Sequence, residues 1–277
     1  MKPSHAHVLA CLFAEAERRG ESGDRGAPLR ILDIGCGYGG LIADAMDAAS
    51  EEGLELELYG FEINEHGAGR ERYLEETLQL LKRRHTSIGW EKRIRIVSSK
   101  EDWPFETGVF DGVISNQVLE HVEDLDRFFG QQQRVLKTGG IVAHHFPSAE
   151  YLVDPHSGVP FAHWPRSDEG RAANLKFFSR IGIGKYRRYR RSRGHSPNAF
   201  VEEFTDYLRR FTYFRSIDKV LDIGAKRGAY LETRYNWALA RRWVSGDASS
   251  AGYESSLPDL SFARALARFA SVTLVSK

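Results

Sequence analysis

Apolar and polar positions along residues 29–147 change period repeatedly, and this change predicts alternating strands and helices. Short apolar or alternating runs predict strands over residues 29–34, 54–62, 94–97, 109–115 and 140–146. Helical spacing predicts helices over residues 40–49, 71–84 and 119–136. This alternation is typical of an α/β fold with a doubly wound parallel sheet and helices on both faces. The ligand site of such a sheet is expected at the carboxyl ends of its strands.

The segments on either side of this unit have different patterns. Apolar positions between residues 8 and 13 predict an amphipathic helix that ends near Gly20, before a polar loop over residues 20–28. Residues 148–200 have no clear strand period, and we interpret them as a lid for substrate recognition. Helical spacing returns at 201–211 and 229–244, and a β-branched segment at 271–275 is expected to close the sheet. The expected parts are therefore a core with its N-terminal helix, the lid and a C-terminal completion of the fold, over residues 1–147, 148–200 and 201–277.

Composition narrows the class of protein. Lys and Arg total 39 and Asp and Glu total 38, so the whole molecule has no field that favours nucleic acid or an anionic membrane. Neither Cys11 nor Cys36 belongs to a CxxC or CxxH pattern that would suggest zinc or redox chemistry, which fits a reducing compartment. Residues 1–20 lack the long apolar stretch of a signal peptide or a spanning helix. We therefore expect a cytoplasmic protein without a transmembrane segment.

A glycine-rich turn follows the first predicted strand. Gly35, Gly37 and Gly39 allow positive φ angles and the close approach of a ligand to the backbone. Glu62, at the end of the second predicted strand, is placed to accept hydrogen bonds from ribose hydroxyls. Nicotinamide enzymes use a related turn and acid, but Asp33 before the turn would be unfavourable beside a pyrophosphate. Asp33 suits the cationic aminoacyl end of a sulfonium cofactor instead.

The order of several motifs resembles that of class I S-adenosylmethionine (SAM)-dependent methyltransferases, of the type 11 and 23 kind. The matching segments are residues 32–39, Glu62, 104–105, 110–121 and 136–140. The resemblance implies a Rossmann-like, seven-stranded sheet with the lid inserted after its fifth strand, and SAM as cofactor. It assigns the adenine to Ser99 and Lys100, although Ser99 stands where an aspartate is common. The cofactor-binding residues expected from the turn and the resemblance are Asp33, Gly35, Cys36, Gly37, Gly39, Glu62, Ile63, Ser99, Lys100, Asn116 and Gln117.

Five histidines lie within residues 121–163, close to the expected mouth of the site. Histidine is the natural general base near neutral pH, and the candidates for catalysis are His121, His145 and His156. His144 and His145 are expected to point to opposite faces of their strand. The alternative for His121 is a capping or packing role.

A second resemblance concerns a metal. Ubiquinone-type O-methyltransferases and small-RNA 2′-O-methyltransferases carry a Glu-x-x-Glu-His motif that holds a divalent ion, and Glu120 and His121 match its end. His156 is a looser match, and Gln117 replaces the first glutamate. The resemblance implies a possible divalent metal on Glu120, His121 and His156, with a preference shifted from magnesium towards zinc or another transition ion.

The acceptor side of the sequence leaves several functions open. The leading hypothesis is O-methylation of a hydroxyl on a sugar-containing or small-metabolite acceptor, including a glycan or glycolipid. A basic cluster at 185–193 could grip phosphates or form a solvated helix face. It therefore keeps an RNA 2′-O-methyltransferase as an alternative, beside a non-catalytic SAM-binding protein. Residues 220–228 repeat part of the glycine motif without its middle glycine, and we interpret them as a structural helix or loop. Oligomeric state is not predicted.

Overall fold

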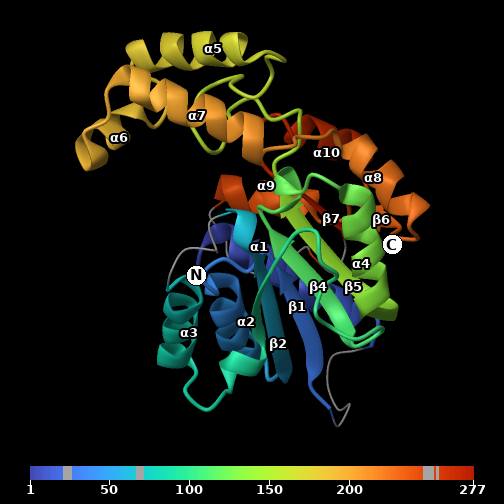
Figure 1. Cartoon of the computed structure of the whole chain (residues 1–277). Helices are drawn as coiled ribbons and strands as arrows, with labels where there is room; N and C mark the ends of the chain where they lie inside the picture. Colours follow the sequence, from blue (N-terminus) through green and yellow to red (C-terminus); the bar gives the residue numbers. More distant parts are fainter. Residues whose placement is uncertain (21–26, 67–71, 246–252, 254–255) are drawn as a thin grey trace.

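A central sheet organises the computed structural model, which describes residues 1–20, 27–66, 72–245, 253 and 256–277 (Figure 1). Its strand order is β3-β2-β1-β4-β5-β7-β6. The strands are β1 (Leu29–Ile34), β2 (Leu56–Ile63), β3 (Ile94–Val97), β4 (Phe110–Asn116), β5 (Leu136–Phe146), β6 (Leu231–Glu232) and β7 (Val272–Ser276). The first five are parallel, and β7 runs antiparallel to both β5 and β6. The expected seven-stranded, Rossmann-like α/β fold is confirmed.

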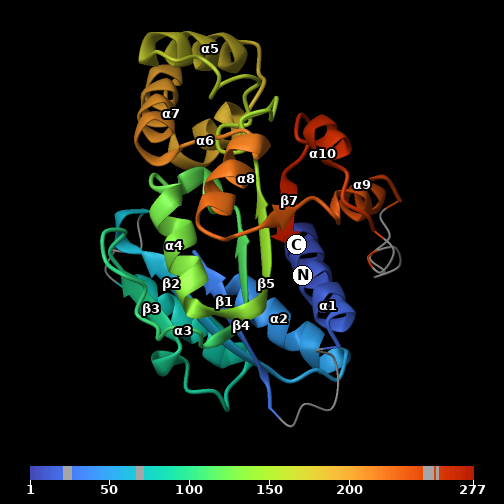
Figure 2. The same ribbon diagram turned by 90° about the vertical axis from the view of Figure 1, so that its right-hand side faces the viewer.

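Helices cover both faces of this sheet. One face carries α1 (Pro3–Arg18), α2 (Gly40–Glu51), α3 (Tyr73–Arg84) and α9 (Asn236–Ser245), and the other carries α4 (Leu125–Val135), α8 (Ile217–Lys226) and α10 (Leu260–Leu266). Figure 2 shows α1 and α4 on opposite sides of β5. Successive residues of β1 serve the two cores, since Ile31 packs with the first group of helices and Leu32 with the second. Short 3₁₀ helices occur at η1 (Asn64–His66), η2 (Trp90–Lys92) and η3 (Leu119–His121).

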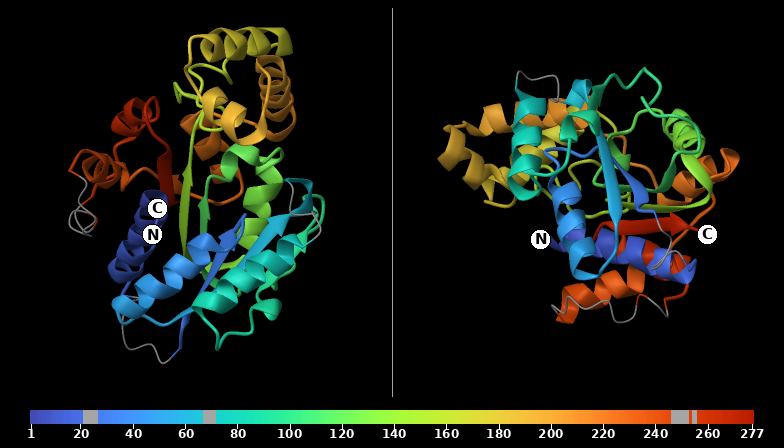
Figure 3. Two further views of the ribbon diagram at one scale, coloured as in Figure 1. Left: turned by 90° about the vertical axis from the view of Figure 1, so that its left-hand side faces the viewer. Right: turned by 90° about the horizontal axis from the view of Figure 1, so that it is seen from below.

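The lid has its own small core. After Phe146 the chain leaves the sheet and forms α5 (Asp168–Arg180), α6 (Tyr186–Arg193) and α7 (Pro197–Phe211). Figure 3 shows these helices as a separate group beyond the end of β5. Their shared core includes Leu175, Phe200, Phe204 and Leu208. Helix α7 runs continuously across residue 200, where the lid was expected to give way to the C-terminal part.

The sequence missed the lid helices for a physical reason. Helix α6 buries no residue, and α5 buries only Leu175 and Ser179, so neither leaves a strong apolar period. The prolines and glycines around them favoured a loop instead. Within the described residues, no helix is both long and apolar enough to cross a membrane.

Three predicted boundaries were wrong. The helix expected over 119–136 is interrupted, because the Asp124 side chain caps the N–H of Arg127 and starts α4 only at Leu125. Strand β5 begins at Leu136 rather than at residue 140, since Leu136 already pairs with Phe110. The helix expected over 229–244 begins only at Asn236, because the preceding residues form β6.

Other predictions lie partly outside the described residues or are confirmed. Most of the loop over 20–28, and residue 71 at the start of a predicted helix, are not described. The structural interpretation of 220–228 is confirmed, because most of this segment lies in α8, which Ser216 caps.

Candidate active site

A tight turn with three glycines follows β1. Gly35, Gly37 and Gly39 have φ angles of +66°, +54° and +76°. A Cβ atom at Gly35 would lie 2.6 Å from the Val118 side chain, so packing and backbone angle both require glycine there. A Cβ atom at Gly37 would meet no protein atom within 4 Å. The backbone of Gly37 is therefore the part of the turn that a ligand can approach, whereas Cys36 is buried beside it.

The Glu62 carboxylate holds this turn against the end of β2. It accepts hydrogen bonds from the N–H groups of Gly37 and Ile63, each at 2.9 Å. Burial raises the pKa of Glu62, and the two N–H donors oppose that shift. Carboxylate oxygens have more than one acceptor position, so the group can also accept hydrogen bonds from ribose hydroxyls. This arrangement is compatible with the contact expected from the sequence.

Asp33 is a buried carboxyl group beside the turn. Its side chain is almost inaccessible, and its Oδ2 atom has no hydrogen-bond partner among the described residues. Burial raises the pKa of Asp33 well above its usual range, and the charge of Glu62 adds to this effect. An unpaired buried carboxylate is costly, and a cationic ligand would offset the cost. Asp33 can therefore serve the cationic group expected from the sequence.

The segment after β3, expected to border the adenine, is exposed but firmly held. Glu65 of η1 accepts hydrogen bonds from the Ser98 hydroxyl at 2.8 Å and from the Ser99 N–H at 3.1 Å. Glu65 had not been predicted as a site residue, since its only signal in the sequence is an acid three positions after Glu62. A carboxylate thus reaches this segment from the end of β2 although Ser99 replaces the usual aspartate.

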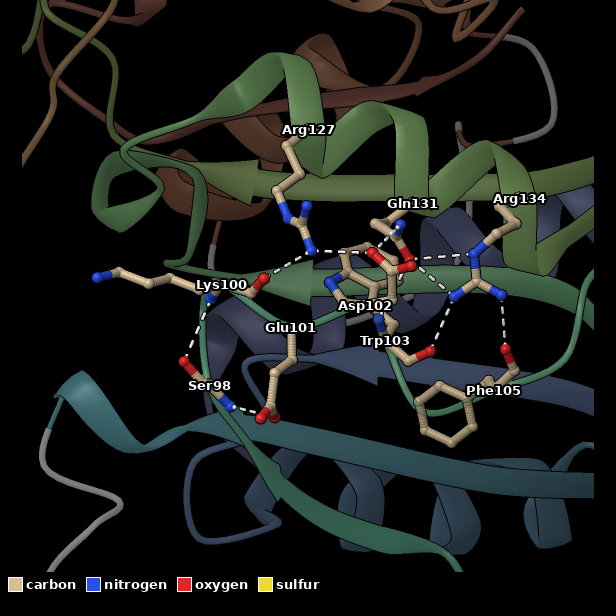
Figure 4. Close-up of polar contacts among 9 residues, drawn as sticks. All are labelled: Ser98, Lys100, Glu101, Asp102, Trp103, Phe105, Arg127, Gln131 and Arg134. Atoms are coloured by element: carbon tan, nitrogen blue, oxygen red, sulfur yellow. Dashed lines mark hydrogen bonds and ion pairs between the residues drawn. The ribbon is translucent and has the colours of Figure 1, made fainter.

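Helix α4 holds the other side of the same segment (Figure 4). Arg127 donates to the carbonyl of Lys100 at 2.9 Å and to the carboxylate of Asp102 at 2.9 Å. Arg134 donates to the carbonyl of Trp103 at 2.8 Å and to that of Phe105 at 2.7 Å. The Lys100 ammonium extends away from this network in Figure 4. These contacts fix the backbone that would border an adenine.

Asn116 and Gln117 at the end of β4 lie next to the start of α1. The Asn116 amide contacts the Ser4 hydroxyl at 3.4 Å, and Gln117 donates to the Ser271 hydroxyl at 3.0 Å. Gln117 has a φ angle of +61°, a left-handed conformation that is uncommon for residues other than glycine and is often found at functional sites. The contact between Ser4 and Asn116 could not be predicted from the sequence.

Glu120, His121 and His156 come together from two distant parts of the chain. Each offers a ligand atom, and these atoms lie within 4.8 Å of one another. The two Nε2 atoms of the histidines are 3.3 Å apart. Glu120 is buried, and neither of its carboxylate oxygens has a hydrogen-bond partner among the described residues. Burial raises the pKa of Glu120 to about 8, and the nearby charge of Asp154 adds to the shift.

The hydrogen bonds of the two imidazole rings define which nitrogen of each ring faces the other ring. His121 Nδ1 lies 2.5 Å from the Phe211 carbonyl, which can only accept, and His156 Nδ1 lies 3.0 Å from the Asp154 carboxylate. Both Nδ1 atoms therefore carry the proton in the neutral rings. The two Nε2 lone pairs then face each other, an arrangement that a shared proton or a cation would stabilise.

Residues of the lid complete the surroundings of this pair. Asp154 is fully buried and also accepts hydrogen bonds from the N–H and hydroxyl of Ser157, both at 2.6 Å. The ring of Tyr207 on α7 is 5.1 Å from that of His156. Phe214 stacks on His163 at 4.2 Å. From the sequence, Asp154 was predicted only as part of the looser match around His156, and Tyr207 had no predicted role.

His145 lies in a different set of contacts. Its Nδ1 atom is 2.9 Å from the Thr273 hydroxyl, and its ring is 5.5 Å from that of His7. Burial lowers the pKa of His145 to about 4. His144 points to the opposite face, as expected, where it contacts Ser115 and burial lowers its pKa to about 3. The catalytic candidates are thus divided between the paired His121 and His156 and a separate buried His145.

A family comparison defines the class of protein to which this fold and turn belong. The model of a methyltransferase domain matches residues 6–185, which is more than half of the chain, and the chain therefore belongs to this methyltransferase family. With its sheet order and glycine turn, it is a class I SAM-dependent methyltransferase.

Curated relatives are similar to less than half of this chain. The sterol 4-C-methyltransferase strm-1 of Caenorhabditis elegans is 32% identical over 135 residues, which are 48% of this chain and 33% of that protein. The mitochondrial ubiquinone biosynthesis O-methyltransferase of Rattus norvegicus is 30% identical over 122 residues, 42% of this chain and 31% of that protein. The chain thus spans about a third of the length of these relatives.

Among solved structures, a SAM-dependent methyltransferase from Mesorhizobium loti is 16% identical, with a TM-score of 0.49. The match covers 95% of this chain and 97% of that one. A geranyl diphosphate C-methyltransferase from Streptomyces coelicolor A3(2) is also 16% identical, with a TM-score of 0.45, and the match covers 96% of this chain and 78% of that one.

Proposed function

We propose that this methyltransferase transfers the methyl group of SAM to a hydroxyl oxygen of a sugar-containing or small-metabolite acceptor, bound beside Glu120, His121 and His156. The observation that carries the proposal is the convergence of two imidazole Nε2 atoms and a buried carboxylate whose side-chain oxygens have no hydrogen-bond partner among the described residues. A hydroxyl acceptor benefits from a group that lowers its pKa or removes its proton. An amine acceptor can react through its own lone pair, and a carbon acceptor must first be made nucleophilic.

The donor side of the proposed reaction uses the turn and its neighbours. SAM supplies the methyl group on a sulfonium centre when it is bound. The backbone of Gly37 accommodates it, Asp33 offers a carboxylate to its ammonium group, and Glu62 accepts hydrogen bonds from its ribose. The segment at Ser99 and Lys100 is assigned to the adenine.

The ligand atoms of Glu120, His121 and His156 could bind a divalent metal ion as well as a proton. Two imidazole nitrogens and one carboxylate are a common ligand set for zinc, and such a set leaves a position for a further oxygen. Asp154 orients His156 in the way that second-shell carboxylates orient metal-binding histidines. A bound ion would lower the pKa of the acceptor hydroxyl. Gln117 bonds Ser271 where the resembling enzymes have a glutamate ligand, so the proposed set is Glu120, His121 and His156.

We assign His156 and His121 to the acceptor and treat His145 as a neutral buried candidate. Its low pKa, caused by burial, makes its ring a poor proton acceptor. In the absence of an ion, we assign the role of base to His156, because Asp154 orients its ring through Nδ1 and its Nε2 atom faces the acceptor side.

A panel of acceptors tests the proposed reaction type. Labelled SAM is incubated with the full-length protein and with catechol, a methyl glycoside, a primary amine or an acidic C–H compound, with and without added zinc or manganese. The proposal predicts labelled methyl ethers from the hydroxyl compounds. Labelled amine or C-methyl products without any ether would overturn it.

A further inference from the structure

The outer end of the lid combines positive charge with exposed apolar side chains. Residues 170–201 contain nine Lys and Arg residues and no Asp or Glu. Helix α6, which carries five of the arginines, lies at the outer end of the lid in Figure 1. Beside it, Phe177, Ile181 and Ile183 are 60%, 55% and 40% exposed. We define these three residues and α6 as the lid tip.

The apolar residues of the lid tip are presented together by the end of α5. Phe177 and Ile181 are one turn apart on the same helical face. The chain then reverses at Gly182, whose φ angle is +83°, and the N–H of Ile183 donates to the carbonyl of Phe178 at 2.9 Å. This C-terminal turn fixes Ile181 and Ile183 close to each other.

The arginines lie against these apolar residues. A Cβ atom at Gly182 would be 2.6 Å from the Arg187 guanidinium, so this cation sits directly on the turn. Arg180 is exposed between Phe177 and Ile181 along α5. Within the described residues, Arg180, Arg187, Arg188, Arg190 and Arg191 have no acidic oxygen within ion-pair distance. The positive charges of these five arginines are thus not neutralised by ion pairs within the described residues.

We propose that the lid tip is a docking surface for an anionic lipid bilayer. Apolar side chains that enter the boundary between headgroups and acyl chains, with Lys and Arg beside lipid phosphates, are the requirements of peripheral membrane binding. The charge of the tip is complementary to that of anionic lipids. The exposed Phe and Ile side chains have no polar atoms to offer, which disfavours a purely phosphate-binding role.

The aromatic residues of α6 favour a bilayer over RNA. Single-stranded RNA is bound by aromatic rings that stack on bases. Tyr186 and Tyr189 point instead towards α7, where their rings lie 5.5 Å and 5.6 Å from that of Phe200. Half-buried rings that already pack on a protein helix are poorly placed to stack on a base.

The same turn is attached to the loop that carries His156. The N–H of Lys185 donates to the Ser157 carbonyl at 2.8 Å, and its ammonium donates to the Pro155 carbonyl at 2.7 Å. Docking would therefore bring the acceptor side of the proposed active site close to the lipid surface. This consequence rests on the proposed function, whereas the docking itself does not.

Vesicle co-sedimentation of the full-length protein tests the docking surface. We expect binding to vesicles that contain phosphatidylglycerol and much weaker binding to phosphatidylcholine alone. Arg188→Gln/Arg190→Gln/Arg191→Gln removes three charges and should weaken binding on the order of 100-fold. Phe177→Ser/Ile181→Ser/Ile183→Ser should weaken it at least about tenfold.

Matched variants control for surface charge and surface apolarity in general. Lys92→Gln/Lys219→Gln/Lys226→Gln and Tyr230→Ser/Leu257→Ser/Phe269→Ser change exposed residues elsewhere and should bind vesicles like the wild type. Unchanged SAM binding shows that each variant is folded. Vesicle binding that persists in both tip variants, no vesicle binding by the wild type, or tight RNA binding without vesicle binding would overturn the proposal. No acceptor is needed, so the result is independent of the proposed methyl transfer.

Discussion

The two sides of the proposed active site are built by different means. The donor side consists of consecutive backbone at the end of β1, with Glu62 locked to the N–H groups of Gly37 and Ile63. The acceptor side consists of side chains from separate segments, with His121 before α4 and His156 in the lid. If these assignments hold, a short sequence motif is enough to build the cofactor site at the turn. The acceptor site instead depends on how the tertiary fold brings distant segments together.

Loss of either paired histidine should have the largest effect on one side only. His156→Ala and His121→Ala should each reduce methyl transfer about 100-fold or more, since each removes a group that binds or deprotonates the acceptor. SAM affinity should change less than about twofold, because neither side chain is assigned to the donor side. Calorimetry and the acceptor panel measure both quantities. His195→Ala, elsewhere in the lid, is the control, and full activity of both test variants would remove their assigned role.

Loss of the Glu62 charge should affect SAM binding, which the histidine substitutions should leave nearly unchanged. Glu62→Gln should weaken SAM binding on the order of 30-fold to 100-fold, because it removes the charge from the hydrogen bond with Gly37 and from the proposed hydrogen bonds with the ribose. Glu57→Gln, at the other end of β2, serves as the control because Glu57 pairs with Arg30, Arg93 and the Tyr59 hydroxyl, away from the turn. Equal SAM affinity in the two variants would argue against the ribose contact.

The pH dependence of SAM binding should report on Asp33. Burial raises the pKa of Asp33, so its carboxyl group holds a proton to higher pH than usual, and the cofactor ammonium favours the carboxylate. SAM affinity should therefore fall as pH is lowered through the raised pKa, and binding near that pKa should release protons. Calorimetry in buffers of different ionisation enthalpy measures the release. Asp33→Asn should abolish it, and unchanged release in that variant would exclude Asp33 as the source.

A smaller effect is expected from the residue that orients His156. Asp154→Asn should reduce methyl transfer roughly tenfold, because the imidazole loses its charged partner while a hydrogen bond can remain. Asp168→Asn at the start of α5 is the control. A change in acceptor KM and transfer rate with unaltered thermal stability would separate orientation from folding. If only the stability changes, Asp154 has a structural role alone.

The strands and the turn of the proposed donor side could be predicted from the sequence because their signals are local. The limits of β1 and β3 follow from apolar runs, and the turn after β1 follows from glycines that positive φ angles require. Glu65 was missed because its hydrogen bonds to Ser98 and Ser99 depend on the packing of β2 beside β3.

The acceptor side could be predicted only in part. Glu120, His121 and His156 were grouped through a resemblance, and the structure places them together. Tyr207 was not foreseen, because its approach depends on how α7 packs across the lid. The start of α4 at Leu125 likewise depends on a cap at Asp124, which a helical apolar period does not reveal.

Metal binding by the full-length protein tests the division between the two sides most directly. Calorimetric titration with zinc and with manganese, in the presence and absence of SAM, compares the wild type with Glu120→Gln and His156→Ala. We expect a single ion site in the wild type that both substitutions weaken at least about tenfold, with SAM affinity unchanged. Equal metal binding by all three proteins, or no metal binding by the wild type, would contradict the assignment of a metal to the paired histidines and Glu120.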